Sequence, residues 1–133
     1  MAAPAGAFVM RNSLVTIDTV EYANQTSTAR LTPEVETQTW KGLVPDAIVQ
    51  DVDSPVWTFN LNAIQDYVTA QGLARYLTDN HGEQIAVTLE PRAPSGVSAS
   101  FTAVAVACEF GGEQGSFATI EVELPVIGQP VFT

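Results

Sequence analysis

The chain has 133 residues, enough for one domain with a single hydrophobic core, and its 46% hydrophobic content is typical of an ordered protein. Its 15 acidic side chains outnumber its 5 basic ones, which gives a formal net charge of −10 with the cations scattered singly. Binding to nucleic acid or to an anionic membrane depends on clustered Lys and Arg at phosphates, so this charge balance argues against both.

After an N-terminal arm at residues 1–13, the sequence predicts one β-rich domain over residues 14–133. Segments rich in Val, Thr, Ile and aromatic residues with a period of two predict strands. The expected strands cover residues 14–22, 28–40, 56–62, 84–90, 98–110 and 116–126. Pro33 should interrupt the second strand or place it at a sheet edge, because proline has no N–H for the strand ladder. This set of strands predicts a mainly β fold, either a β-sandwich or a barrel.

One segment predicts a short α-helix on the flank of the β domain, at about residues 66–80. Its residues Leu73, Tyr76 and Leu77 are spaced i, i+3 and i+4, so they would share one face of a helix. Gly82 follows at the position where a left-handed residue commonly ends a helix.

The segment at residues 41–55 lacks strong periodicity and predicts a long loop. It carries more aliphatic side chains than a solvated loop needs. The loop either folds back on its own domain or buries these side chains against another subunit, and the sequence leaves both possibilities open. Trp40 and Trp57, on either side of the loop, are expected to be anchors in or near the core.

Cysteine usage and the N-terminus indicate an intracellular protein. Cys108 is the single cysteine, so no disulfide can form within the chain, and its place in a predicted strand indicates a small buried side chain. Residues 1–13 lack the basic start of a signal peptide, and no apolar run reaches membrane-spanning length. We expect no membrane binding by this chain.

No combination of residues in the sequence suggests catalysis. The single histidine, His81, lies in the turn expected after the helix, and no nucleophile motif accompanies it. Asp46, Asp51 and Asp53 lack the glycine and the bidentate glutamate of a calcium loop. We predict no enzymatic activity, no cofactor and no metal site.

The period of two divides three of the predicted strands into a core-facing side and an outward side. Trp57, Phe59 and Leu61, and the corresponding apolar residues of the two later strands, should face the core. The outward side then carries hydroxyl, amide and carboxylate groups without a cation, at Asn60, Asn62, Thr88, Glu90, Thr119, Glu121 and Glu123. Sheet faces usually mix both charge signs, so uniform acidity indicates a functional cause.

Several stretches, in this order, resemble the major tail tube protein of long, non-contractile-tailed bacteriophages. They are LTPEVETQTWKGLVP, QDYVTAQGLARYLTDNHGE, FGGEQGSFATIEVELPV and the closing GQP. The resemblance covers roughly Leu14 to Pro130 and lies in the order and spacing of these stretches.

The resemblance implies a β-sandwich-like tail-tube fold with a flanking helix. It implies hexameric rings with one continuous inner β-barrel, stacked into the tube through which DNA leaves the capsid. The chain would be made in the host cytoplasm and end in the virion. Its partners would be further copies of itself and the tape-measure, tail-tip and tail-terminator proteins, and DNA would pass without specific binding.

The resemblance suggests a physical role for the acidic face. Lysines in a DNA-conducting bore would bind phosphates in every ring by releasing counterions, whereas carboxylates repel phosphates over roughly 8 Å at physiological salt. We hypothesise that the seven polar residues of the three strands face the bore. The 41–55 loop would form contacts between subunits or rings, through Leu43, Val44, Ile48, Val49, Asp51, Val52 and Asp53. The N-terminal arm would lie along a neighbour.

Other classes of protein share some of these features. A different virion structural protein, such as a tail-completion or terminator protein, a capsid-decoration protein or an immunoglobulin-like module, would have similar β content and acidity. A small-ligand-binding β-barrel would need an interior pocket, but the predicted core positions hold large apolar side chains. An enzyme is opposed by the lack of a paired base and nucleophile.

Overall fold

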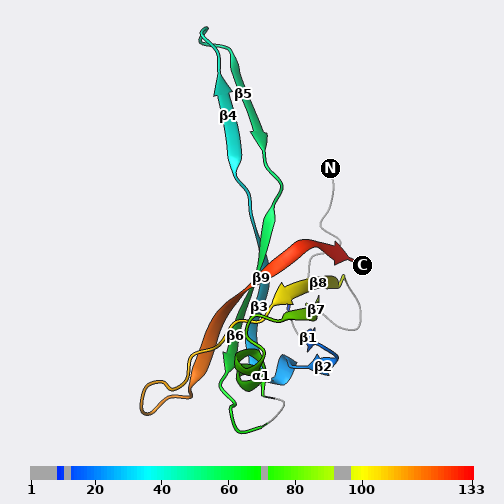
Figure 1. Cartoon of the computed structure of the whole chain (residues 1–133), viewed down its shortest axis with the longest axis vertical. Helices are drawn as coiled ribbons and strands as arrows, with labels where there is room; N and C mark the ends of the chain where they lie inside the picture. Colours follow the sequence, from blue (N-terminus) through cyan, green and yellow to red (C-terminus); the bar gives the residue numbers. More distant parts are fainter. Residues whose placement is uncertain (1–8, 11–12, 70–71, 92–96) are drawn as a thin grey trace.

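The computed structural model describes residues 9–10, 13–69, 72–91 and 97–133, and this part of the chain is mainly β, as predicted (Figure 1). In chain order the elements are β1 (Leu14–Ile17), β2 (Val20–Glu21), the 3-10 turn η1 (Ala23–Gln25), β3 (Thr26–Glu34), β4 (Thr37–Lys41), β5 (Ile48–Val52), β6 (Val56–Ile64), α1 (Leu73–Asp79), β7 (Gln84–Glu90), β8 (Ala99–Val104) and β9 (Thr119–Phe132).

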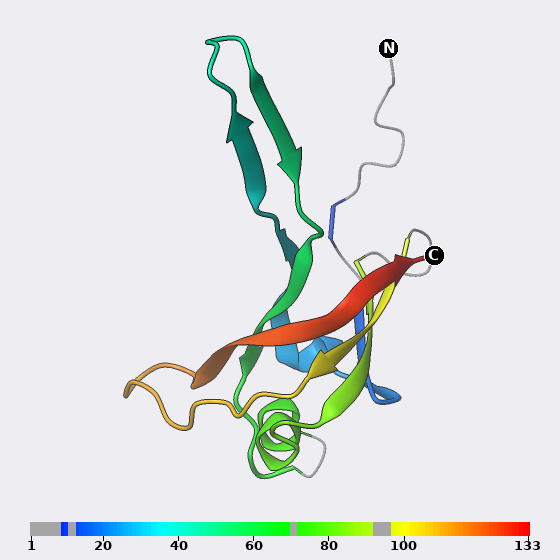
Figure 2. The ribbon, with the colours of Figure 1, turned by 45° about the horizontal axis from the view of Figure 1, so that its top comes forward.

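Seven strands form one curled antiparallel sheet in the order β2-β1-β7-β8-β9-β6-β3. β9 joins its two layers, because residues 119–125 pair with β6 while residues 126–132 pair with β8. The strand bends as it passes from one layer to the other (Figure 2). We call β3, β6 and residues 119–125 the β6 layer, and β1, β2, β7, β8 and residues 126–132 the β7 layer.

The core lies between the β6 layer and the β7 layer. Phe59 of β6 meets Phe101 of β8 edge to face, with ring centroids 5.0 Å apart. The alternation predicted from the sequence is confirmed by buried side chains on three strands, at Phe59, Leu61, Ile85, Val87, Leu89, Ile120, Val122 and Leu124. Trp57, predicted for the same side, is only half-buried. α1 lies at the end of the body farthest from β4 and β5 and buries Leu73, Ala74 and Leu77 (Figure 1).

The helix is shorter than predicted, because α1 begins at Leu73 rather than near residue 66. Oδ1 of Asp66 accepts two backbone N–H groups that follow it, at 3.2 and 3.0 Å, and so holds this stretch in a turn. A Cβ on Gly72, just before the helix, would lie 2.1 Å from the Asp66 carbonyl oxygen. The predicted end is confirmed by Gly82, which has a φ of 86°. Within the described ranges, no helix has the length and apolar character needed to cross a bilayer.

Two predicted strands are each divided in the structure. Residues 14–22 form β1 and β2 around a tight turn at Asp18 and Thr19, both of which have positive φ, 49° and 73°. Residues 28–40 form β3 and β4 with a break between them. Pro33 lies in β3, which is the last strand of the seven-stranded sheet, so the predicted edge position is confirmed.

The predicted strand at residues 98–110 ends early, at Val104. Beyond this point the chain bonds to the turn after α1 instead of to a strand. The Ala107 N–H donates to Nδ1 of His81 at 2.9 Å, and the Cys108 N–H donates to Oγ1 of Thr78 at 3.2 Å. The predicted strand at residues 116–126 is longer than expected, since β9 continues to Phe132.

The prediction of a long loop at residues 41–55 is wrong. Residues 48–52 form β5, which pairs with β4 to make a two-stranded hairpin that projects from the body (Figures 1 and 2). Neither face of the β4–β5 hairpin is buried, so its sequence lacks the polar and apolar alternation by which strands are recognised. Trp40 lies on this hairpin with 64% of its surface exposed, so it is not a core anchor.

Candidate functional site

Five of the seven residues predicted for the bore come together on the outward face of the β6 layer. Asn60 is the direct cross-strand partner of Glu123, and Asn62 is the partner of Glu121. Thr119 begins β9 on the same face, opposite Ile64. We call these five residues the polar face.

The other two predicted residues, Thr88 and Glu90, lie elsewhere. Both belong to β7, and β8 and β9 separate β7 from β6 in the sheet. The core-facing sides of the two layers meet at Phe59 and Phe101, so their outward faces point in opposite directions. The seven residues therefore do not form one surface, because the period of two distinguishes inward from outward but not one layer from the other.

The structure adds a cation that the sequence argument missed. Arg30 of β3 pairs directly with Asn60 of β6, so its side chain shares the outward face. It lines a shallow depression together with Asn60, Asn62, Glu121 and Glu123. One guanidinium against two carboxylates leaves the lining of this depression with a net charge of −1 in each copy. The expectation of a face without any cation is therefore wrong, since it considered only three strands and omitted β3.

Asn60 is held within this face by β3. Its Nδ2 donates to Oγ1 of Thr32 at 3.2 Å. Its Oδ1 is buried and has no hydrogen-bond partner among the described residues. A buried acceptor without a donor costs about 1–3 kcal/mol, so this oxygen is a place where a further donor would be stabilising.

Among the described residues, neither outer edge of the β6 layer has a neighbouring strand. The Gln65 N–H donates to the Ala118 carbonyl at 2.9 Å. In an antiparallel pair only every second pair of opposite residues is hydrogen-bonded, so this bond shows which residues of β6 and β9 bond to each other. By alternation, Glu121 and Glu123 turn their backbone groups away from β6. No strand of the described chain pairs with β9 there, because β8 reaches β9 only from Val126 onward.

The opposite edge of this layer is β3. Its residues Arg30 and Thr32 bond to β6, so by alternation Ala29 and Leu31 turn their N–H and C=O groups outward. Pro33 also falls at an outward position, where the ladder has no need of its missing N–H. Within the described part of the chain, the β6 layer is thus a three-stranded sheet with a free edge on each side.

The β4–β5 hairpin carries six of the seven residues predicted for contacts between subunits, and the seventh, Asp53, follows β5 directly. Its ten strand residues are all exposed. Trp40 pairs with Val49 on one face, and Lys41 pairs with Ile48 on the other, so apolar side chains occur on both faces. An isolated two-stranded hairpin is marginally stable in water, so this one requires a surface to pack against.

The tip of the hairpin is a defined turn. The Gly42 N–H donates to the Ala47 carbonyl at 2.6 Å, and the Ala47 N–H donates to the Val44 carbonyl at 3.1 Å. A Cβ on Gly42 would lie 2.6 Å from the Cβ of Ala47 and 3.2 Å from the Trp40 ring. A larger residue at position 42 would have to displace Ala47 or Trp40, so this close-packed turn favours glycine.

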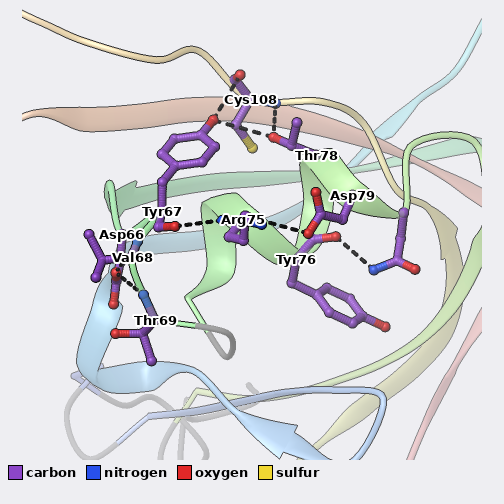
Figure 3. A network of polar contacts seen from close by, with 10 residues as sticks. Asp66, Tyr67, Val68, Thr69, Arg75, Tyr76, Thr78, Asp79 and Cys108 are labelled. Carbon is purple, nitrogen blue, oxygen red and sulfur yellow. Dashed lines mark hydrogen bonds and ion pairs between the residues drawn. The ribbon is translucent and has the colours of Figure 1, made fainter.

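A network of polar contacts connects Cys108 and Glu109 to Thr78 of α1 and to Tyr67, which precedes the helix (Figure 3). The Tyr67 hydroxyl lies 3.1 Å and 3.0 Å from the carbonyl oxygens of Cys108 and Glu109, to which it can donate. Arg75 forms an ion pair with Asp79 at 2.9 Å. These contacts tie the chain after β8 to the body, and they account for the early end of that strand.

The groups in this network are not set up for catalysis. Burial, with a smaller contribution from Glu109, raises the pKa of Cys108 to about 11, so the thiol stays protonated at neutral pH. Burial and the hydrogen bond to Asp18 raise the pKa of Tyr76 to about 12. His81 uses Nδ1 to accept a backbone N–H, which is a structural role. In the described part of the chain, no group of three or more His, Cys, Asp or Glu side chains is placed to hold a metal ion.

No protein-family model matches this chain, and no curated protein matches it in sequence.

Proposed function

We propose that the chain is a structural virion protein, the tail tube subunit of a long, non-contractile phage tail. It polymerises as stacked hexameric rings that form the conduit for DNA ejection, and it is not an enzyme. The observation that carries this proposal is the β6 layer, a three-stranded sheet whose outward face is polar and acidic and whose two edges have no partner strand among the described residues.

The free edges favour assembly through the β6 layer. A strand edge with unpaired N–H and C=O groups is a template for pairing with another chain, and closing a sheet into a barrel removes such edges. Six copies of a three-stranded layer would supply about 18 strands, and barrels of 16–18 strands enclose an aqueous channel. The polar face would then line the channel.

The chemistry of the polar face suits a surface that conducts DNA without binding it. Each copy contributes two carboxylates and one guanidinium, so the channel wall remains net negative. The amides and hydroxyl of the face add no charge. Phosphates near this wall are repelled over roughly a Debye length, about 8 Å at physiological salt.

The β4–β5 hairpin supports a further level of assembly. It projects from the body (Figure 1), and side chains of its turn, such as Leu43 and Val44, are exposed. Contact with a neighbouring subunit or a stacked ring would bury these side chains and stabilise the hairpin. The tape-measure, tail-tip and tail-terminator proteins would be the remaining partners, and the finished location would be the virion.

Electron microscopy of the purified protein and of virions tests the proposal. We expect hollow tubes of stacked rings with six subunits around the axis and the polar face inside. In tubes of Asn62→Lys, a change on the middle strand of the layer and away from both edges, we expect retention of duplex DNA that weakens as salt is raised, and slower ejection. A discrete particle that does not stack would indicate a terminator or decoration protein instead, and normal ejection through the lysine variant would refute the role of the acidic face.

A further inference from the structure

We propose that β3 of one copy joins β9 of a second copy as a parallel strand pair, with Arg30 of the first copy opposite Glu121 or Glu123 of the second. We call this strand pair the joint. It rests on the proposed function in that it would repeat around the ring. The two free edges and their charges, however, are properties of a single chain.

The side chains next to the two free edges decide how they can be joined. On β3 the residues that turn their backbone groups outward, Ala29 and Leu31, have core-facing side chains. On β9 the corresponding residues, Glu121 and Glu123, have exposed side chains on the polar face. The residues whose backbone groups are available for pairing thus have core-facing side chains at the β3 edge but outward-facing side chains at the β9 edge.

This difference selects a parallel joint. In an antiparallel pair, residues that bond to each other lie directly opposite and on the same face, so Leu31 would meet Glu121 and one copy would be turned inside out. In a parallel pair, a residue that turns its backbone groups toward the partner lies opposite one that turns them away. Leu31 then lies opposite a core-facing residue such as Val122, and Arg30 lies opposite Glu121 or Glu123.

The direction of the strands agrees with this result. β3 and β9 are both antiparallel to β6, so they run the same way within one copy. A rotation about a ring axis keeps the strand direction of every copy. The β3 strand of one copy and the β9 strand of the next therefore meet in parallel, and a heterologous contact of this kind repeats until the ring closes.

The charges at the two edges are complementary. Arg30 is on the polar face at the β3 edge, and within the described residues the only ion pair is Arg75 with Asp79. Glu121 and Glu123 are on the same face at the β9 edge. The joint would bring the cation of one copy beside the carboxylates of the next, as a cross-strand pair of opposite charge.

Glu109 protects the β9 edge in the single chain. Its Oε1 accepts the outward N–H of Glu121 at 3.2 Å, which places a third carboxylate beside Glu121 and Glu123. Charged side chains at sheet edges commonly oppose unwanted strand pairing. Formation of the joint requires this carboxylate to leave, so Glu109→Ala should associate at a lower protein concentration than the wild type.

Charge exchange tests the joint. The full-length chain is prepared as Arg30→Glu and as Glu121→Lys/Glu123→Lys, and self-association is measured by sedimentation up to about 1 mM. Each variant alone meets like charge at every joint, so we expect association on the order of tenfold weaker than in the wild type. In an equal mixture every joint between unlike copies has opposite charges, so we expect association to return, with the two variants alternating around an even-numbered ring.

A control variant, Glu90→Lys/Glu113→Lys, changes the net charge by the same amount as Glu121→Lys/Glu123→Lys but at positions away from the joint. It should associate as the wild type does. The inference is wrong if the mixture associates no better than its components, or if the wild type stays monomeric at about 1 mM. Six-fold rings of the wild type that are indifferent to these substitutions would overturn the joint and leave the proposed function standing. Charge-dependent association into particles other than rings would support the joint and contradict the proposed function.

Discussion

Removal of the β4–β5 hairpin should separate folding of the body from assembly. Residues 37–52 can be replaced by an Asn-Gly turn, because the Asp53 N–H donates to the Glu36 carbonyl at 2.9 Å and the two ends already face each other. This bond is the one that closes a two-residue hairpin turn, and Asn-Gly is the sequence such turns prefer. The shortened chain therefore keeps the strands β3 and β6 in register.

We expect the free energy of unfolding to change by no more than about 2 kcal/mol. All ten strand residues of the hairpin are exposed, so their removal opens no cavity, and shortening a loop eightfold changes its closure free energy by about 2 kcal/mol. Burial of Trp40, Ile48 and Val49 against a neighbour would contribute about 1.5–3 kcal/mol for each side chain. Loss of this contact should weaken assembly by more than about 1,000-fold.

Thermal unfolding and electron microscopy of the shortened chain measure the two effects. The melting temperature should stay within about 10 °C of the wild-type value while tubes disappear. A matched control with Trp40, Ile48 and Val49 changed to Thr keeps the hairpin but removes its apolar side chains, and it should also fail to form tubes. Tubes from the shortened chain, or a large loss of stability, would refute the view that the hairpin serves assembly alone.

Two further changes test the body of the protein. At pH 8 the thiolate fraction of Cys108 should be about 100-fold below that of a thiol with pKa 9.0. Alkylation should therefore be correspondingly slow in the folded chain and should accelerate toward pH 11. Equal alkylation rates in folded and urea-unfolded protein would contradict the burial of this group. Thr19→Gly should stabilise the protein by about 1 kcal/mol in urea unfolding, because Thr19 is β-branched with a φ of 73°, and a neutral result would show that the turn is unstrained.

The strands that bury one face could be predicted from the sequence because their signal is local. Along β6, β7 and the first half of β9, most core side chains alternate with polar ones, so the inward and outward positions of residues such as Phe59 and Glu121 follow from adjacent residues alone. The β4–β5 hairpin has no buried face, so it carries no such signal, and its pairing became evident only in the structure. The early end of β8 likewise depends on contacts with Thr78 and His81, which are distant in sequence.

The sequence by itself determined that this protein is mainly β, which way the side chains of its core strands point, and that its outward surface is acidic. The tertiary structure decided which outward residues share a surface. It separated Thr88 and Glu90 from the polar face, because the curled sheet places β7 and β6 in opposite layers. It brought Arg30 onto that face and left both edges of the β6 layer without a partner strand in the described part of the chain. Strand pairing joins segments about 30 and 60 residues apart, and no local pattern records that choice of partner.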